Sequence, residues 1–214
     1  QPFTHWEKIN PEWMKRILQL GLPIGLAIFF EVSLFSTAAI VLSPLGETIV
    51  AAHQIAISVT SQLFMIPMSL AIALTIRVGT YYGEQNWQAM RKVQYLGLIT
   101  ATILAILTMI LLWAFRNEIV ALYTSDMIVT QIAVYLILFA IAYQLMDGWQ
   151  ISAAGCLRGM QDTKGPMWIT MLAYWVIAFP VGVYLSRFTD MGAAGVWVGL
   201  IVGLSVACVV LLAR

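Results

Sequence analysis

Long apolar runs separated by short polar segments dominate this chain. Six runs are long enough to cross about 30 Å of hydrocarbon as helices, because each helical residue advances roughly 1.5 Å. They cover approximately positions 17–42, 49–76, 93–115, 128–157, 166–186 and 193–213. Glycine, proline and charged residues fill the segments between them. The pattern predicts six membrane-spanning helices.

Composition supports this interpretation. The chain is 61% hydrophobic and only 10% charged, whereas a soluble domain carries about 25% charged residues. We therefore expect an all-α integral membrane protein. A net charge of +1 gives no reason to expect a nucleic-acid partner. The two cysteines, Cys156 and Cys208, lie in apolar runs and are interpreted as small packing residues.

Basic residues alternate between the two sides of the predicted bundle. One side carries nine Lys and Arg residues: Lys8, Lys15, Arg16, Arg77, Arg91, Lys92, Arg158, Lys164 and Arg214. The other side carries two, Arg116 and Arg187. Loops rich in Lys and Arg stay in the cytoplasm, so both ends of this chain are predicted to be cytoplasmic. If one helix were added or removed, the basic residues would no longer be concentrated on one side of the membrane.

The segment before the first run is predicted to lie at the membrane surface. Asn10 and Pro11 read as a helix start, with Asn as the cap and Pro at the first position. Trp13 lies close to basic residues, a combination typical of the membrane interface. The predicted organisation is a cytoplasmic interfacial connector over 1–16 and a six-helix bundle over 17–214.

Glycine and proline inside the runs predict close packing and kinks. Small residues four apart let a neighbouring helix approach, as in the series Gly195, Gly199 and Gly203 and in the pairs Gly21/Gly25 and Gly79/Gly83. Three prolines lie within predicted helices and are expected to kink them: Pro23, Pro67 and Pro180.

Two carboxylates lie deep in apolar runs. Glu31 is near the middle of the first run and Asp147 lies in the fourth, and none of the six runs contains Lys or Arg. A charge near the bilayer centre costs at least ~2.5–3.5 kcal/mol, so such residues usually serve a function. Two acids without a fixed basic partner need protons or a bound cation. The pattern indicates a coupled transporter.

Asp147 belongs to a polar stripe on its predicted helix. Tyr143, Gln144 and Gln150 lie within about one turn of it, so the stripe should face the protein interior or a water-filled cavity. Phenolic and carboxylate oxygens suit a hard cation such as Na⁺, and a carboxyl group in apolar surroundings also suits proton carriage. A purely structural alternative is a protonated acid that is hydrogen-bonded between helices.

The second run carries further polar residues near its start. His53 is expected to be solvated or to cap the helix. Gln54 and Gln62 are eight residues apart and lie on similar faces. They could line the same cavity.

Several motifs together resemble the second half of NorM-type multidrug and toxic compound extrusion (MATE) transporters. The motifs span nearly the whole chain: Leu22-Pro23-Ile24-Gly25 leading to Phe29-Phe30-Glu31, Ala51-Ala52-His53-Gln54-Ile55-Ala56, Arg77-Val78-Gly79 with Gly83, and Arg158-Gly159-Met160-Gln161-Asp162-Thr163-Lys164 with Pro166. In the family these segments belong to helices seven and eight, the loop after helix eight, and the loop between helices ten and eleven.

The resemblance implies a fold and an activity. The family fold is two six-helix bundles related by a pseudo-two-fold axis, and this chain resembles the second bundle. It begins with Gln1 and stops at Arg214 directly after an apolar run, so we expect a piece of a longer polypeptide whose N-terminal six-helix half is the partner. The implied activity is export of cationic, often aromatic drugs across the bacterial inner membrane in exchange for Na⁺ or H⁺, with Na⁺ favoured. No other cofactor and no enzymatic activity are expected.

The resemblance also implies site residues. The family's cation site matches Glu31, Tyr143 and Asp147, which would hold a monovalent metal ion. A glutamine near bound drug matches Gln54, and Glu31 and Asp147 are expected to contact the drug as well.

Three other functions are weaker alternatives. A flippase for lipid-linked sugars would need a basic cavity for pyrophosphate, but the acids are the charges embedded here. An ion channel subunit would need a filter loop or rings of charge, which the sequence does not show. An intramembrane protease could use Glu31 and Asp147 as an acidic dyad, but the residues around them match no protease pattern.

Overall fold

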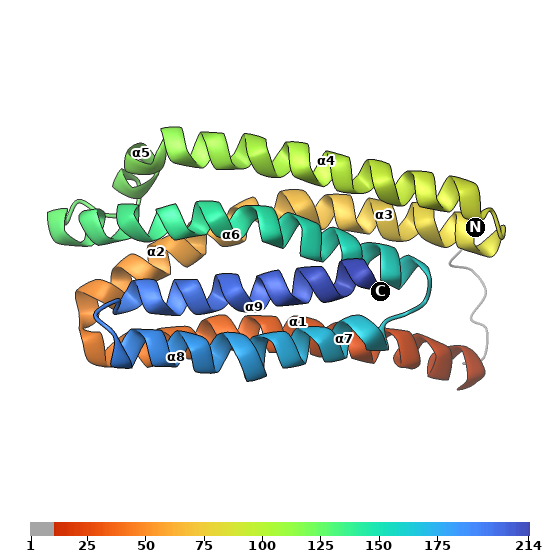
Figure 1. The fold of residues 1–214 in the computed structure, drawn as a ribbon, viewed down its shortest axis with the longest axis horizontal. Coiled ribbons are helices and arrows are strands. Elements are labelled where there is room, and N and C mark those ends of the chain that lie inside the picture. Colours follow the sequence, from red (N-terminus) through yellow and green to blue (C-terminus); the bar gives the residue numbers. More distant parts are fainter. Residues whose placement is uncertain (1–10) are drawn as a thin grey trace, which may run out of the picture.

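The computed structural model describes residues 11–214, and the secondary structure in this part is helical. Six helical stretches are long and apolar enough to cross a membrane: Pro11–Leu45, Glu47–Gly83, Trp87–Ala114, Met127–Gly159, Lys164–Phe188 and Ala193–Ala213. They coincide with the six predicted runs to within a few residues at most ends. The predicted six-helix bundle is therefore confirmed, and Figure 1 shows the helices lying side by side along one long axis.

The first helix begins earlier than its apolar run. Helix α1 spans Pro11–Leu42 and has Glu12 in its first turn, as the helix-start motif predicts, and a short helical turn, η1 (Ser43–Leu45), follows it. Residues 11–16, predicted to belong to the connector, form the first turns of α1. Asn10 and the rest of the predicted connector, residues 1–10, lie outside the described residues.

A proline divides the second span into two helices. Helix α2 (Glu47–Leu63) and helix α3 (Met65–Gly83) are separated at Phe64. Pro67 has no N–H to donate to the carbonyl of Leu63, four residues earlier, so the regular hydrogen-bond ladder is interrupted there. The kink predicted at Pro67 is confirmed, and Figure 1 shows α2 leaving the line of α3 at an angle.

The fifth span changes its winding before Pro180. It consists of α7 (Lys164–Met171), a π-helical stretch η2 (Leu172–Ala178) and α8 (Phe179–Phe188). Proline removes one backbone donor, and a wider turn re-pairs the backbone around the gap. The sequence predicted an irregularity at Pro180 but not its form.

Helix α6 is the centre of the bundle. The remaining helices are α4 (Trp87–Ala114), α5 (Arg116–Ala121), α6 (Met127–Gly159) and α9 (Ala193–Ala213). Asp126 caps α6 by accepting hydrogen bonds from the backbone N–H groups of Ile128 and Val129, at 2.8 and 3.0 Å. Helix α6 packs against α2, α3, α4 and α9, and most of its C-terminal half is buried.

The predicted glycine packing is confirmed for α9. A side chain added to Gly195, Gly199 or Gly203 would overlap with backbone atoms of α8 or η2, so these glycines let the last two spans touch. A side chain added to Gly21 or Gly25 would meet nothing within 4 Å in the described chain, so neither glycine packs closely on a helix of this half.

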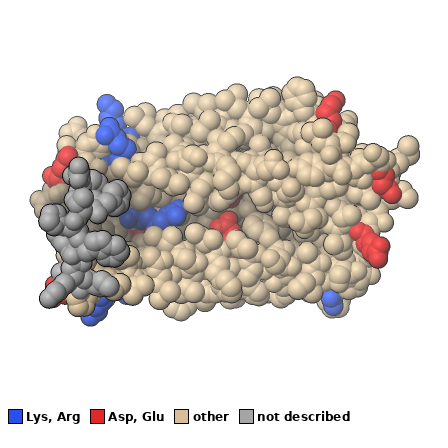
Figure 2. Space-filling model, turned by 180° about the vertical axis from the view of Figure 1, so that it is seen from behind, with Lys and Arg blue, Asp and Glu red and all other residues tan. Residues whose placement is uncertain are grey.

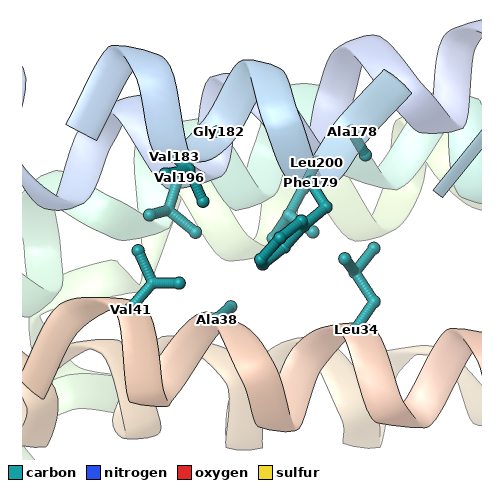
Figure 3. A pocket seen from close by; sticks show the side chains of 9 residues that line it. All are labelled: Leu34, Ala38, Val41, Ala178, Phe179, Gly182, Val183, Val196 and Leu200. Carbon is teal, nitrogen blue, oxygen red and sulfur yellow. The ribbon is translucent and has the colours of Figure 1, made fainter. Parts of the chain in front are cut away.

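One face of α1 packs on the last two spans. Leu34, Ala38 and Val41 of α1 point toward Phe179 and Val183 of α8 (Figure 3). The gap they leave is about 10 Å³, barely enough for one water molecule, and all its lining residues are apolar. This contact fixes the rotation of α1 about its axis, and the neighbouring face, which carries Glu31, is turned toward α6.

Candidate functional site

The candidate site on α6 is a set of residues spaced by whole helical turns. Tyr143, Asp147, Ile151 and Arg158 follow one another at intervals of four, four and seven residues, so they lie on one side of the helix. All but Arg158 are buried, and Asp147 is only 1% exposed. The predicted polar stripe of Tyr143, Gln144, Asp147 and Gln150 is buried at all four positions, which confirms that these residues face the protein interior rather than lipid.

Helix α1 supplies the opposing wall. Ile28, Glu31 and Phe35 recur every three or four residues on the face that looks toward α6. Together with the α6 set and residues around the break between α2 and α3, they line a cavity of about 280 Å³. Figure 2 shows red and blue side chains inside a hollow near the middle of this face, whose other charged side chains lie toward its two ends. The structure thus brings Glu31, Tyr143 and Asp147 to one cavity.

Oxygen atoms in this cavity are available to a ligand. Asp147 Oδ1 is buried and accepts no hydrogen bond in the described structure. The ring of Tyr143 is held edge-on between Phe35 and Trp197, with ring centroids 6.3 and 6.4 Å away. A buried carboxylate oxygen without a partner is costly unless an ion, a proton or water satisfies it. The cavity therefore offers a buried carboxylate oxygen that a cation, a proton or water could satisfy.

The third charged side chain of this region, Arg158, lies where the sequence did not predict it. Arg158 was placed in a loop, but α6 continues to Gly159. Arg158 lines the same cavity as Glu31 and Asp147, and its charge attracts that of Glu31. The acids do have a basic neighbour. The signal in the sequence was its spacing, eleven residues or three helical turns after Asp147.

Residues 23–184 match the MatE family, which is more than half of the chain. The chain belongs to the MatE family. It is 73% identical, over its whole length, to a probable multidrug resistance protein NorM of Acinetobacter baylyi, of which it covers 48%. It is 44% identical over 217 residues to the multidrug resistance protein NorM of Photobacterium profundum, and the match covers 99% of this chain and 47% of that protein.

The fold of this MatE chain is also similar to a solved structure. The eukaryotic MATE transporter AtDTX14 superposes with a TM-score of 0.89 at 22% identity, covering 95% of this chain and 47% of the other. The MatE chain therefore spans about half the length of the relatives that it matches. The family and the half-transporter fold inferred from the motifs are confirmed.

A second, smaller cavity of the MatE chain adjoins the first. It has a volume of about 40 Å³ and shares Ile28, Glu31, Ile151 and Arg158 with the larger one. Gln150, the last member of the predicted polar stripe, lines it, and its buried Oε1 atom has no hydrogen-bond partner in the described structure. Glu31 and Arg158 therefore border both spaces.

Tyr174 is a buried polar residue close to the acids that sequence reasoning missed, although it lines neither cavity. It lies in η2, is 3% exposed, and its hydroxyl has no hydrogen-bond partner among the described residues. Its phenol interacts electrostatically with Glu31 and with Asp147. A tyrosine in an apolar run gives no signal by itself, but π-helical turns are frequent at functional sites.

Other predicted residues lie elsewhere in the MatE chain. Gln54 is exposed on α2 and is not among the residues that line either cavity. Gln62 donates a hydrogen bond to the hydroxyl of Tyr123 at 2.9 Å, likewise outside the cavities. Gln144 is buried but faces the contact between α3 and α4.

The expectation for His53 is wrong. It is 1% exposed rather than solvated, and its ring packs edge-on against Trp197 with the centroids 5.9 Å apart. Helix α2 begins at Glu47, so His53 lies two turns inside the helix and not at its end. The lengthened helix carries the imidazole into the contact with α9.

Proposed function

We propose that this chain is the C-terminal half of a cation-coupled multidrug antiporter that exports organic cations. The observation that carries the proposal is the cavity in which Glu31, from α1, meets Tyr143 and Asp147, from α6. Two acids on separate helices let a bound ion change how those helices sit against each other, which is what coupling requires. The partner is the N-terminal six-helix half of the same polypeptide, in a bacterial inner membrane with both ends of this half in the cytoplasm. Figure 2 supports that orientation, because most blue side chains gather at one end of the view.

In the proposed cycle, Glu31, Asp147 and Tyr143 bind Na⁺ in preference to H⁺. All three offer oxygen ligands, which a hard cation prefers. Ion and drug compete for the same acidic cavity, and ion entry from outside favours the conformation that releases drug outward. Rocking of the two bundles about the site supplies alternating access. Because Gln54 does not line the cavity, it would contact drug at another point of the transport path.

A flippase for lipid-linked sugars fits the cavity less well. Arg158 does place one basic group there, yet two acids outnumber it among the described lining residues. Pyrophosphate would be repelled by that balance, whereas an organic cation would be attracted. The relatives' names, which refer to multidrug resistance, also favour efflux.

The test is transport by the full-length protein in proteoliposomes loaded with a fluorescent cationic dye. An inward Na⁺ gradient and an inward H⁺ gradient are imposed separately, with equal membrane potential. We expect dye efflux driven by Na⁺. Efflux driven by H⁺ alone would reassign the coupling ion, and no gradient-driven efflux of any cationic dye would overturn the proposal.

The two α6 ligands should differ in their importance for cation binding. Asp147→Asn should weaken Rb⁺ binding on the order of 100-fold, because it removes a unit charge from a buried site. Tyr143→Phe removes only a hydroxyl dipole and should weaken binding roughly fivefold. Radiotracer Rb⁺ titration of the purified full-length variants measures both. A larger loss for Tyr143→Phe would show that the ligand hierarchy is wrong.

A further inference from the structure

The charged groups that line the larger cavity do not cancel. In the described chain they are Glu31, Asp147 and Arg158, and the phenols of Tyr143 and Tyr174 face the same acids. With both carboxyl groups ionised, the acids contribute two negative charges and the guanidinium offsets one. A single negative charge remains, which one monovalent cation neutralises.

We propose that Arg158 determines the charge of the ion that this site accepts, and that it does so by acting on Glu31. The proposal rests on the cation site proposed above at Glu31, Tyr143 and Asp147. Arg158 restricts the site to one monovalent cation and excludes divalent cations. It is therefore a specificity-determining residue that need not touch the ion itself.

Backbone packing holds Arg158 in position. Gly155 and Gly159 flank it on α6, and a side chain at either would overlap with the backbone of α3. Thr75 of α3 donates a hydrogen bond to the carbonyl of Gly155 at 2.9 Å. The guanidinium is steadied by a hydrogen bond from its Nε to the carbonyl of Ala154 at 3.2 Å. A half-buried cation fixed in this way is a permanent part of the cavity wall.

The position of Arg158 also leaves room for the ion. It borders both cavities together with Glu31, but no ion pair within 4.0 Å joins the two side chains in the described structure. Arg158 therefore lowers the negative potential at Glu31 without occupying the carboxylate. A monovalent cation can still bind between α1 and α6. A divalent cation would leave an excess positive charge in a poorly solvated cavity, which is costly.

The experiment measures Rb⁺ binding to the purified full-length transporter and its displacement by Mn²⁺, a divalent ion that also prefers oxygen ligands. Arg158→Gln should bind Rb⁺ roughly tenfold more tightly than the wild type, because one repelling charge is gone. It should also allow Mn²⁺ to displace Rb⁺, which the wild type resists. Arg158→Lys keeps the charge and should retain the wild-type behaviour.

Two further variants make the comparison specific. Arg77→Gln removes a cation at the same end of the bundle, where Arg77 is exposed and stacks on Tyr81 at 5.6 Å; it should change neither measurement. The double variant Glu31→Gln with Arg158→Gln leaves the charge of Asp147 unopposed, so it should bind Rb⁺ more tightly than Glu31→Gln alone, but by less than the gain that Arg158→Gln gives when Glu31 is present. A structural role for Arg158 would instead weaken Rb⁺ binding in both backgrounds.

Three results overturn the proposal. Unchanged or weaker Rb⁺ binding by a folded Arg158→Gln protein is the first. A gain in Rb⁺ affinity that is as large without Glu31 as with it is the second. Displacement of Rb⁺ by Mn²⁺ in the wild type, which requires no variant to fold, is the third. If the wild type binds no Rb⁺, the proposed cation site is wrong as well. If the wild type binds Rb⁺ and any of these three results is found, only the role of Arg158 is wrong.

Discussion

Full-length transporter carrying Glu31→Gln should lose ion-driven dye efflux while still folding and reaching the membrane. The substitution keeps the shape of the side chain but removes its charge, and the cavity that retains Asp147 and Arg158 would then be neutral. A neutral cavity has no electrostatic reason to bind a cation, so Rb⁺ affinity should fall on the order of 100-fold. Efflux in proteoliposomes and Rb⁺ titration of the same preparation measure the two effects.

The matched control is Glu84→Gln. Glu84 is exposed at the C-terminal end of α3 and does not line the cavities. It should leave both efflux and Rb⁺ binding at the wild-type level. Wild-type efflux by Glu31→Gln would remove Glu31 from the coupling mechanism, whatever its place in the structure.

The second large effect concerns this half alone. An isolated polypeptide of residues 1–214 should bind Rb⁺ weakly but move no dye across a liposome membrane. Glu31, Tyr143 and Asp147 are all present in it, whereas alternating access requires a second bundle to rock against. The exposed surface agrees with a missing partner: only 11% of the most apolar stretch of α1 is buried within this half, compared with 50% in α9.

Reconstitution of this half with a fluorescent cationic dye decides the matter, and chemical cross-linking reports its oligomeric state. Dye movement driven by an ion gradient without any cross-linked dimer would overturn the half-transporter interpretation. Movement together with a dimer would mean that two copies replace the missing bundle. Co-expression with the N-terminal half should restore efflux and is the positive control.

The spans could be predicted because their signal is local. A run of about 20 apolar residues has one stable arrangement in a bilayer, a helix that pairs its own backbone groups. Pro67 was equally informative, since a missing N–H interrupts any helix. The ends of α1 and α6 were less predictable, because polar residues such as Arg158 continue a helix when packing supports it.

The site could be predicted only in part. Glu31 and Asp147 could be singled out because they are acids in apolar runs. Whether their side chains reach the same cavity depends on how α1 and α6 are placed in the bundle. The resemblance supplied that pairing, and the packing of Leu34 on α8 explains it. The proximity of Tyr174 to the acids and the burial of His53 could not be predicted, because both follow from contacts between spans that are distant in the sequence.

The break at Phe64 links the shape of the cavity to the direction of α2. Residues on both sides of the break, including Thr60 and Met68, line the cavity, so the angle between α2 and α3 and the volume available to the ion are geometrically linked. Helix α2 has 17 residues and is thus about 25 Å long. A tilt of about 10° at Phe64 would move its far end by roughly 4 Å on that length. A small change in the angle at the cavity would therefore become a larger displacement at the far end of α2.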